Sequence, residues 1–166
     1  MIIVNKPDYT LLGKIVEHYE GYSAMAYPDT GGVITIGFGS TYNFDRNRKV
    51  RMGDFITREI AENWLEIEFE IVVKQLNHYI KVPLKTHQAT ALVDYIYNRG
   101  IGNMLKTRLD DLINKNPNDP RIRQEILSTG LRDRMGNLLW GLGRRRRTEA
   151  NLYFTGELKF NFKRWG

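Results

Sequence analysis

The 166-residue sequence contains no cysteine, which excludes disulfide bonds, thiolate metal sites and a cysteine nucleophile. It also has no apolar stretch near the roughly 20 residues that a membrane-spanning helix needs. The N-terminus lacks the long apolar segment of a signal peptide, and Pro7 interrupts it. We therefore expect a cytoplasmic chain, without an export signal or anchor, that is stabilised by packing alone.

Hydrophobic residues make up 42% of the chain and charged residues 27%, which is typical of a folded globular protein, and the length predicts one domain over residues 1–166. The net charge is +6, and residues 121–166 hold eleven Lys or Arg against four Asp or Glu. This basic C-terminal region indicates an anionic partner: nucleic acid, a lipid surface or an acidic polymer such as the cell wall. The sign of the charge does not choose among them.

The first part of the chain predicts a helix followed by a hairpin. Apolar residues recur at helical spacing over 11–19, and Gly21 is placed to end the helix, so Glu20 lies on its last turn. A glycine turn and alternating β-branched residues within 24–40 then predict a β-hairpin. Period two directs Thr35 away from the apolar face, where it can line a cleft.

The rest of the chain is expected to be mainly helical. Residues 41–54 are polar and basic and read as a loop or a second hairpin. A long helix is predicted from an N-cap at Thr57 to residue 80, joining two lobes, and a buried one over 86–99. Shorter helices are expected at about 103–115, from Asp119 through 127, and at about 144–155. This order predicts the α+β class, with a cleft where the lobes meet.

Hydrolysis of a glycosidic bond needs an acid that protonates the leaving oxygen and a carboxylate on the opposite side that activates water or attacks directly. Glu20 at a helix end and Asp29 at a hairpin turn are candidates for these two roles. Spacing alone does not single them out, because the chain has 19 acidic residues.

Several ordered motifs carry a specific family resemblance. Glu20-Gly21, Ala26-Tyr27-Pro28-Asp29-Thr30-Gly31-Gly32 and Thr35-Ile36-Gly37-Phe38-Gly39 resemble the signature of the phage lysozymes, glycoside hydrolase family 24. The steps of nine and six residues from Glu20 to Asp29 to Thr35 match the spacing of that family's catalytic Glu, Asp and Thr. Later landmarks follow in the same order: Val82-Pro83-Leu84, Tyr97-Asn98-Arg99-Gly100 and the run from Gly141 to Gly156.

The resemblance implies a lysozyme-like fold, with a small β-hairpin lobe over about 20–60 and a helical lobe over about 61–166 onto which the N-terminal helix packs. It implies a monomeric endolysin that cleaves the β-1,4 bond between N-acetylmuramic acid and N-acetylglucosamine in peptidoglycan, with inversion. Glu20 is then the general acid, Asp29 and Thr35 handle the attacking water, and neither a metal nor a cofactor is needed. Such an enzyme stays in the cytoplasm of the infected bacterium until holin-type lesions open a path to the wall.

This sequence departs from the family pattern in three places. Ser40 stands where many relatives have His, so any ion pair made by that His is absent. The stretch 40–54 is longer and more basic than usual. Trp140, immediately before Gly141, does not obviously match a tryptophan that is common in relatives. These departures affect the substrate groove and the last helices rather than Glu20, Asp29 and Thr35.

Some features keep more than one interpretation. The run Arg144–Arg147 reads as a solvated helix face with one or two ion pairs, as a patch for anionic wall or lipid, or as a nucleic-acid contact, in that order of preference. The aromatic and basic tail 160–165 either packs on the first helix or offers a surface to membranes. The three histidines lack ligand spacing. The alternative to an enzyme is a non-catalytic basic module that binds nucleic acid or a membrane surface.

Overall fold

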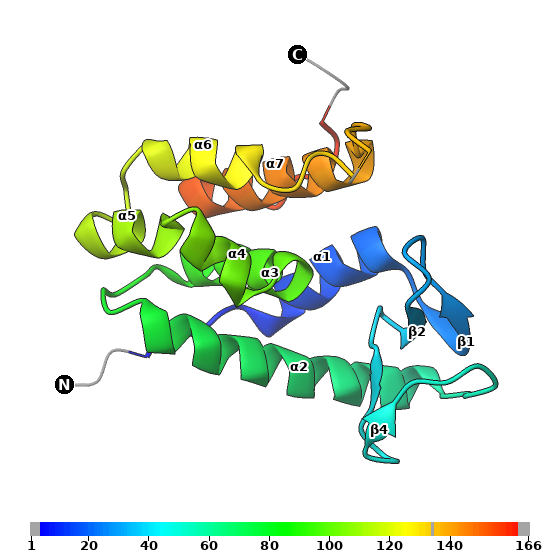
Figure 1. Cartoon of the computed structure of the whole chain (residues 1–166). Helices are drawn as coiled ribbons and strands as arrows, with labels where there is room; N and C mark the ends of the chain where they lie inside the picture. The colour runs from blue at the N-terminus through cyan, green and yellow to red at the C-terminus, as the bar shows by residue number, and fades with distance from the viewer. Residues whose placement is uncertain (1–3, 134, 163–166) are drawn as a thin grey trace. The chain divides into compact units, whose positions relative to one another are not determined.

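The structure is a computed structural model that describes residues 4–133 and 135–162. These residues form two compact units. The small unit is Gly13–Glu70, and the helical unit comprises the described residues up to Leu12 and from Ile71 onward. Helices α1 (Tyr9–Glu20) and α2 (Arg58–Tyr79) contribute residues to both. Helices combined with short antiparallel strands confirm the predicted α+β class (Figure 1).

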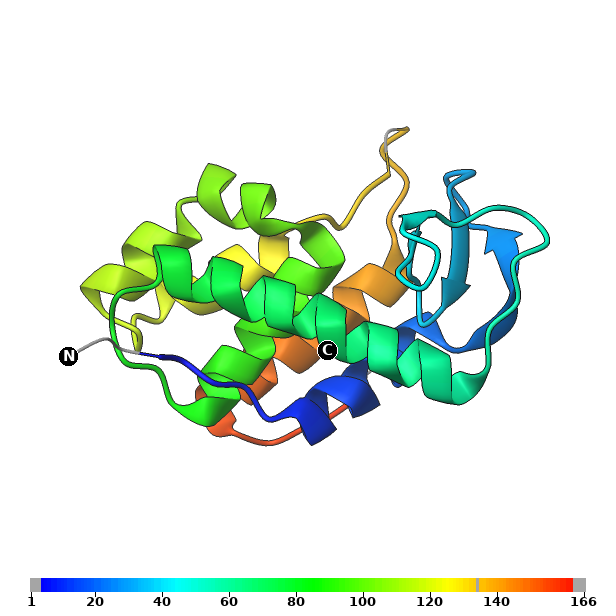
Figure 2. The same cartoon turned by 90° about the horizontal axis from the view of Figure 1, so that it is seen from below.

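Two hairpins make up the β structure of the small unit (Figure 2). Strands β1 (Ser23–Pro28) and β2 (Ile34–Gly37) pair antiparallel, and an irregularity between Ser23 and Tyr27 shifts their register. Strands β3 (Tyr42–Asn43) and β4 (Arg48–Lys49) form the second hairpin, so of the two structures expected for 41–54 the hairpin is present. On its other side β1 bonds to residues 54–56, which the sequence did not predict.

Residues 35–38, which include most of β2, are buried whichever face of the hairpin they lie on. The sequence predicted apolar and polar residues alternating along β2, but Thr35, Ile36, Gly37 and Phe38 are all buried. Gly37 shows why: a Cβ built there would lie 3.1 Å from Ala61 Cβ, because the start of α2 packs against the strand. Thr35 is therefore inside the small unit rather than on an open face.

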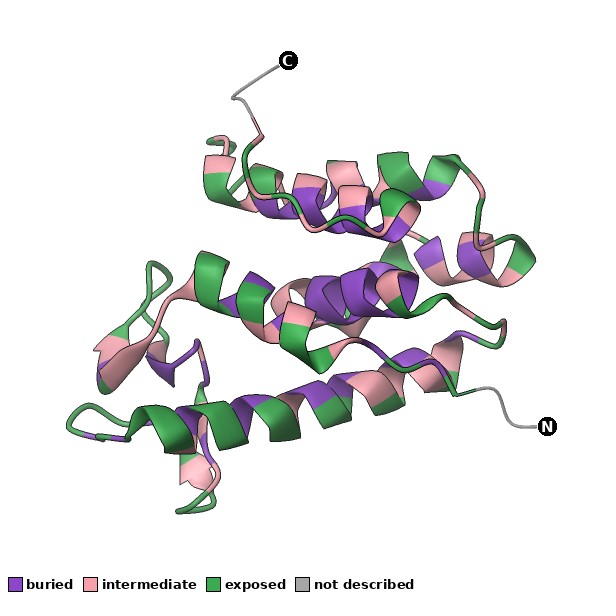
Figure 3. Cartoon of the chain, turned by 180° about the vertical axis from the view of Figure 1, so that it is seen from behind, coloured by how far each residue is buried: buried purple, intermediate pink, exposed green. Residues whose placement is uncertain are grey.

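Helix α3 (Thr86–Arg99) is the core of the helical unit, and every residue from Gln88 to Ile96 is buried. Figure 3 shows the middle of α3 in the colour of buried residues, whereas α2 carries buried and exposed bands along its length. Helix α3 packs against α4 (Ile101–Lys106) and α7 (Trp140–Thr155), and α7 lies beside α6 (Arg121–Ser128). The predicted buried helix over 86–99 is thus confirmed.

Two of the predicted helices have different bounds. The helix expected at about 103–115 is divided into α4 and α5 (Leu109–Lys115) at Arg108, whose φ of 58° is incompatible with a continuous helix. Helix α7 begins at Trp140, earlier than expected. The N-cap predicted at Thr57 is present, since its hydroxyl oxygen accepts the Ile60 N–H at 3.3 Å. In the part of the chain that the structure describes, no helix is long and apolar enough to cross a membrane.

Candidate active site

Glu20 is the last residue of α1, as predicted. Buried Ile15 and Val16 anchor this part of the helix in the small unit. Gly21 ends it with a φ of 69° and an N–H that donates to Glu17 O at 3.0 Å. The half-buried Glu20 carboxyl lies against Gly39, where an added Cβ would come within 3.3 Å of Oε2. A glycine at 39 therefore leaves room for the carboxyl beside the end of the hairpin.

Asp29 begins the turn between β1 and β2. Its Oδ1 accepts the backbone N–H groups of Gly31 and Val33, both at 2.8 Å. Its own N–H donates to Val33 O and its carbonyl accepts the Gly32 N–H, both at 2.9 Å. These bonds fix the carboxylate through one oxygen, and Oδ2 takes no part in them. The exposed side chain is thus oriented by the turn while one oxygen stays available to a proton.

Thr35 lies on β2, directly opposite Tyr27 in the hairpin register. Its buried hydroxyl donates to Val33 O at 2.9 Å. Because a hydroxyl oxygen also has two lone pairs, Thr35 Oγ1 is still able to accept a hydrogen bond from a water molecule. Val33 bonds both Asp29 and Thr35, so the turn couples the positions of these two side chains.

Tyr27 is a further residue of this region, and its sequence position alone did not mark it as part of the site. Burial raises the pKa of its phenol, and the negative charges of Glu20 and Asp29 raise it further. Both carboxylates therefore lie within electrostatic range of this one side chain. The signal that was available is its position, two residues before Asp29 and across the hairpin from Thr35. The three predicted residues and Tyr27 all belong to the small unit.

Ser40, which stands where many relatives have His, is a neutral hydrogen-bond donor. Its hydroxyl donates to Glu68 Oε1 on α2 at 2.7 Å, and Tyr42 O is an alternative acceptor at 3.0 Å. Arg58, at the start of α2, pairs with Glu17 on α1. The loss of the histidine therefore leaves α2 hydrogen-bonded to the residue that follows the β1–β2 hairpin.

The basic stretch 41–54 is anchored to the small unit by its acidic residues. Arg48 makes a bidentate pair with buried Asp54, at 2.8 and 2.7 Å, and the hydrogen bond from Arg48 holds the Asp54 pKa well below its ordinary value. Asp45 Oδ1 accepts the indole N–H of buried Trp64 at 3.1 Å. One of the four cations in this stretch is thus committed to the fold.

In the helical unit, two arginines of the run Arg144–Arg147 are buried against acidic side chains. Arg145 donates to both oxygens of Asp94, at 2.9 and 2.7 Å, and Arg146 donates to Glu149 at 2.7 Å. All four side chains are at most 2% exposed. The preferred interpretation, a solvated face with one or two ion pairs, is right about the pairing but wrong about the solvation of these two. The face of α7 that packs against α3 carries them.

Among the described residues, no group of three or more His, Asp or Glu side chains is arranged to hold a metal ion. The His87 ring instead bonds Leu152 O through Nδ1 at 2.9 Å, and the His18 ring packs edge-on against Tyr19. The histidines described here thus make packing and hydrogen-bond contacts.

The fold and the arrangement of the small unit define a lysozyme-like protein. The phage lysozyme family model matches residues 17–149. The chain belongs to this family, as the sequence resemblance predicted.

Individual relatives agree with this assignment. The chain is 36% identical over 87 residues to the endolysin of Acyrthosiphon pisum secondary endosymbiont phage 1, which covers 52% of this chain and 56% of the relative. It is 30% identical over 147 residues to the endolysin of Bacillus phage B103, and this alignment covers 87% of this chain and 53% of the relative. These alignments span about half the length of each relative.

Solved structures give the same fold over nearly the whole chain. The endolysin from Escherichia coli O157:H7 phage FAHEc1 superimposes with a TM-score of 0.79 at 30% identity, covering 88% of this chain and 92% of that one. The muramidase domain of SpmX from Asticaccaulis excentricus has a TM-score of 0.77 at 24% identity, covering 91% and 99%. The second of these likenesses supports the fold alone.

Proposed function

We propose that the chain is a glycoside hydrolase, an N-acetylmuramidase that cleaves the β-1,4 bond between N-acetylmuramic acid and N-acetylglucosamine in bacterial peptidoglycan. The observation that carries the proposal is local to the small unit. Glu20 and Asp29 both act electrostatically on Tyr27, and Thr35 is paired with Tyr27 across the hairpin. Membership of the phage lysozyme family supports the same chemistry.

In the proposed mechanism Glu20 donates its proton to the leaving glycosidic oxygen. Asp29 takes a proton from the attacking water through the oxygen that the turn leaves unused, while Oδ1 stays bound to two backbone N–H groups. Thr35 accepts a hydrogen bond from the same water and so orients it. Attack from the face opposite the leaving group inverts the anomeric carbon.

The site of action we propose is the wall of the bacterial host, which the enzyme reaches as a monomer from the cytoplasm through holin-type lesions. Peptidoglycan is the main partner and no nucleic acid is involved. The basic C-terminal region provides a further contact with anionic lipid, for which the exposed Arg123 and Arg144 are available, whereas Arg145 and Arg146 are buried. Lys163 and Arg164, part of the tail considered for this role, lie outside the described residues.

The test measures the release of reducing ends from purified peptidoglycan by the wild type and by Glu20→Gln, Asp29→Asn and Thr35→Ala. Glu20→Gln keeps the size of the side chain but cannot donate the proton, so we expect a loss of about 100- to 10,000-fold. Asp29→Asn should lose most activity. Thr35→Ala should lose less, because Asp29 is still present to take the proton from the attacking water. Glu17→Gln, an exposed carboxylate on the same helix, is the control and should stay active.

Retention of more than about a tenth of the activity by folded Glu20→Gln would remove the acid from the scheme. A wild type that releases no reducing ends but binds duplex DNA or vesicles would favour the non-catalytic module instead. That alternative is less well supported at present, because the matched relatives are named endolysins and Glu20, Asp29 and Thr35 are all present.

A further inference from the structure

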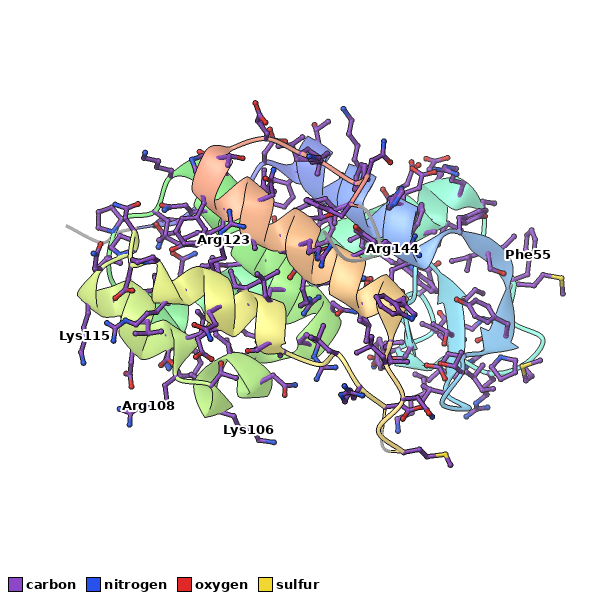
Figure 4. The ribbon with its side chains drawn as sticks, turned by 90° about the horizontal axis from the view of Figure 1, so that it is seen from above. Phe55, Lys106, Arg108, Lys115, Arg123 and Arg144 are labelled. Carbon is purple, nitrogen blue, oxygen red and sulfur yellow. The ribbon has the colours of Figure 1, made fainter. Side chains whose placement is uncertain are left out.

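The small unit exposes three large apolar side chains that the proposed chemistry does not use. Met25 is 60% exposed, Met52 61% and Phe55 66%. We call these three residues the Met25–Phe55 patch. Figure 4 shows Phe55 at the outer edge of the unit, with its side chain directed away from the ribbon.

Backbone pairing brings the members of the patch together. Met25 in β1 is the antiparallel bridge partner of Phe55. Their neighbours make the hydrogen bonds, from Ala26 N to Asp54 O at 3.0 Å and from Ile56 N to Ala24 O at 2.9 Å. This pattern is that of a non-hydrogen-bonded pair, in which the two side chains lie on the same face and at the closest cross-strand spacing.

Met52 belongs to a tight turn, residues 51–54, that directly precedes Phe55. The Asp54 N–H donates to Arg51 O at 3.0 Å, and the Arg51 N–H donates to Asp54 Oδ2 at 3.0 Å. Gly53 adopts a φ of 91° to complete the turn. Since the Asp54 carbonyl accepts the Ala26 N–H of β1, the turn that contains Met52 leads directly into the segment that pairs with β1. The patch is a face, because β1 has hydrogen-bonded neighbours on both of its edges.

Three exposed cations lie within residues 41–54, the stretch that also contains Met52. Arg46, Lys49 and Arg51 are exposed. Asp54 is neutralised by its pair with Arg48, whereas Asp45 keeps its negative charge while it accepts the Trp64 indole N–H, so residues 41–54 carry a formal charge of +2. The segment therefore presents positive charge together with flexible apolar side chains.

We propose that the Met25–Phe55 patch, with Arg46, Lys49 and Arg51, is a docking surface for an anionic phospholipid bilayer. The cations bind lipid phosphates while the thioether and phenyl side chains enter the boundary between headgroups and acyl chains. Charge complementarity selects this occupant over a second copy of the chain, because a symmetric contact at this face would bring like cations together. This surface is distinct from the basic C-terminal region.

The first test is sedimentation of the whole protein with vesicles of phosphatidylglycerol and phosphatidylethanolamine, compared with vesicles of phosphatidylcholine alone. We expect binding to the anionic vesicles that weakens as salt rises. The triple variant Met25→Ser, Met52→Ser, Phe55→Ser should bind about tenfold more weakly or worse, since it loses most of the insertable apolar surface. Met135→Ser, at a position 88% exposed in the helical unit, is the matched control and should bind normally.

A second pair of matched variants tests how much the cations of the proposed surface contribute to vesicle binding. The triple variant Arg46→Gln, Lys49→Gln, Arg51→Gln should bind anionic vesicles more weakly than the wild type. Its binding should also depend less on the salt concentration. The control variant Lys74→Gln, Lys106→Gln, Lys115→Gln removes the same number of exposed charges from the helical unit. It should lower binding clearly less, because these residues lie outside the proposed surface. Equal losses in the two variants would mean that net charge alone drives adsorption, and would overturn the proposal.

Insertion itself can be read directly because the chain has no cysteine. An environment-sensitive fluorophore on Met52→Cys should shift to the blue on anionic vesicles, and the same label on Met135→Cys should not. An unshifted label at position 52, or unchanged binding by the triple serine variant, would contradict the docking surface. Self-association of the wild type that the serine variant abolishes would assign the patch to a second copy instead. None of these readouts depends on glycosidase activity.

Discussion

Two pairs of carboxylates occupy contrasting surroundings in the two units of this chain. Glu20 and Asp29 in the small unit are partly or fully exposed, and Asp29 is oriented by backbone N–H groups. Asp94 and Glu149 in the helical unit are completely buried and paired with arginines. Burial strongly raises the Glu149 pKa. A raised carboxyl pKa therefore belongs here to a structural cluster, so a shifted pKa is not by itself evidence of an active site.

The two units also differ in charge. Residues 13–70 contain six Lys or Arg and ten Asp or Glu, a formal charge of −4, whereas the remaining residues contain nineteen and nine, a charge of +10. The acidic unit thus holds the proposed chemistry, and the excess positive charge lies outside it. Under the proposed function, the helical unit would supply most of the long-range attraction to an anionic wall, and the small unit would cleave the bond.

The largest expected effect on stability comes from a substitution in the buried cluster of the helical unit. Arg145→Gln leaves the Asp94 carboxylate buried without its main partner, which typically costs about 3–5 kcal/mol of folding free energy. Chemical denaturation monitored by circular dichroism measures the loss. The adjacent Arg144→Gln is the matched control: that side chain is exposed, and its replacement should change stability by less than about 0.5 kcal/mol.

The same two variants test whether the buried ion pair of Arg145 contributes to the stability of the fold. If Arg144→Gln and Arg145→Gln were equally stable, the buried ion pair would contribute nothing, and the contrast between the two arginines would be lost.

A smaller effect concerns Glu149 and pH. Burial raises its pKa in the folded state, and the nearby Asp94 charge adds to this, although Arg146 opposes it. The folded state therefore keeps a proton that the unfolded state releases. The resulting stability is fully present below the ordinary value of 4.5 and is lost as pH rises through the folded-state pKa. Glu149→Gln is permanently neutral, so it should gain stability relative to the wild type by about 1 kcal/mol or more between pH 5 and 8.

The titration of Asp94 does not account for a difference in stability between wild type and Glu149→Gln that changes with pH. The charge and hydrogen bonds of Arg145 lower its pKa despite the opposing effect of burial, so its contribution is lost only as pH falls below the ordinary range. Between pH 5 and 8 that contribution therefore does not vary with pH. A stability difference that stays constant from pH 5 to 8 would show that folded Glu149 is ionised throughout.

Local sequence signals predicted the elements that position the site. The glycine after Glu20, the glycine turn after Asp29 and the β-branched residues around Thr35 each dictate backbone geometry within a few residues. The apolar run of α3 likewise predicted a buried helix, because nearly every face of it is nonpolar. The roles assigned to Glu20, Asp29 and Thr35 stay predictions until the variants are measured.

Features set by distant contacts escaped prediction. A run of four arginines reads as a solvated face unless the position of α3 is known, because only Asp94 makes burial of Arg145 tolerable. The break at Arg108 has no glycine to signal its left-handed conformation. The pairing of Met25 with Phe55 joins segments 30 residues apart, and no turn motif marks it.

The smallest expected effect tests whether the two proposed catalytic carboxylates meet at all. The charges of Glu20 and Asp29 contribute to the raised pKa of Tyr27, after burial, so neutralising either carboxylate should lower that pKa while leaving the part due to burial. We expect the Tyr27 ring signal, followed by NMR with tyrosine labelled at Cζ, to titrate at lower pH in Glu20→Gln and in Asp29→Asn than in the wild type. Glu17→Gln is the control, since that carboxylate pairs with Arg58 and does not contribute to the Tyr27 pKa. An unshifted Tyr27 titration in both site variants would place the carboxylates apart. It would thereby remove the geometric support for a shared active site, even if each variant were inactive.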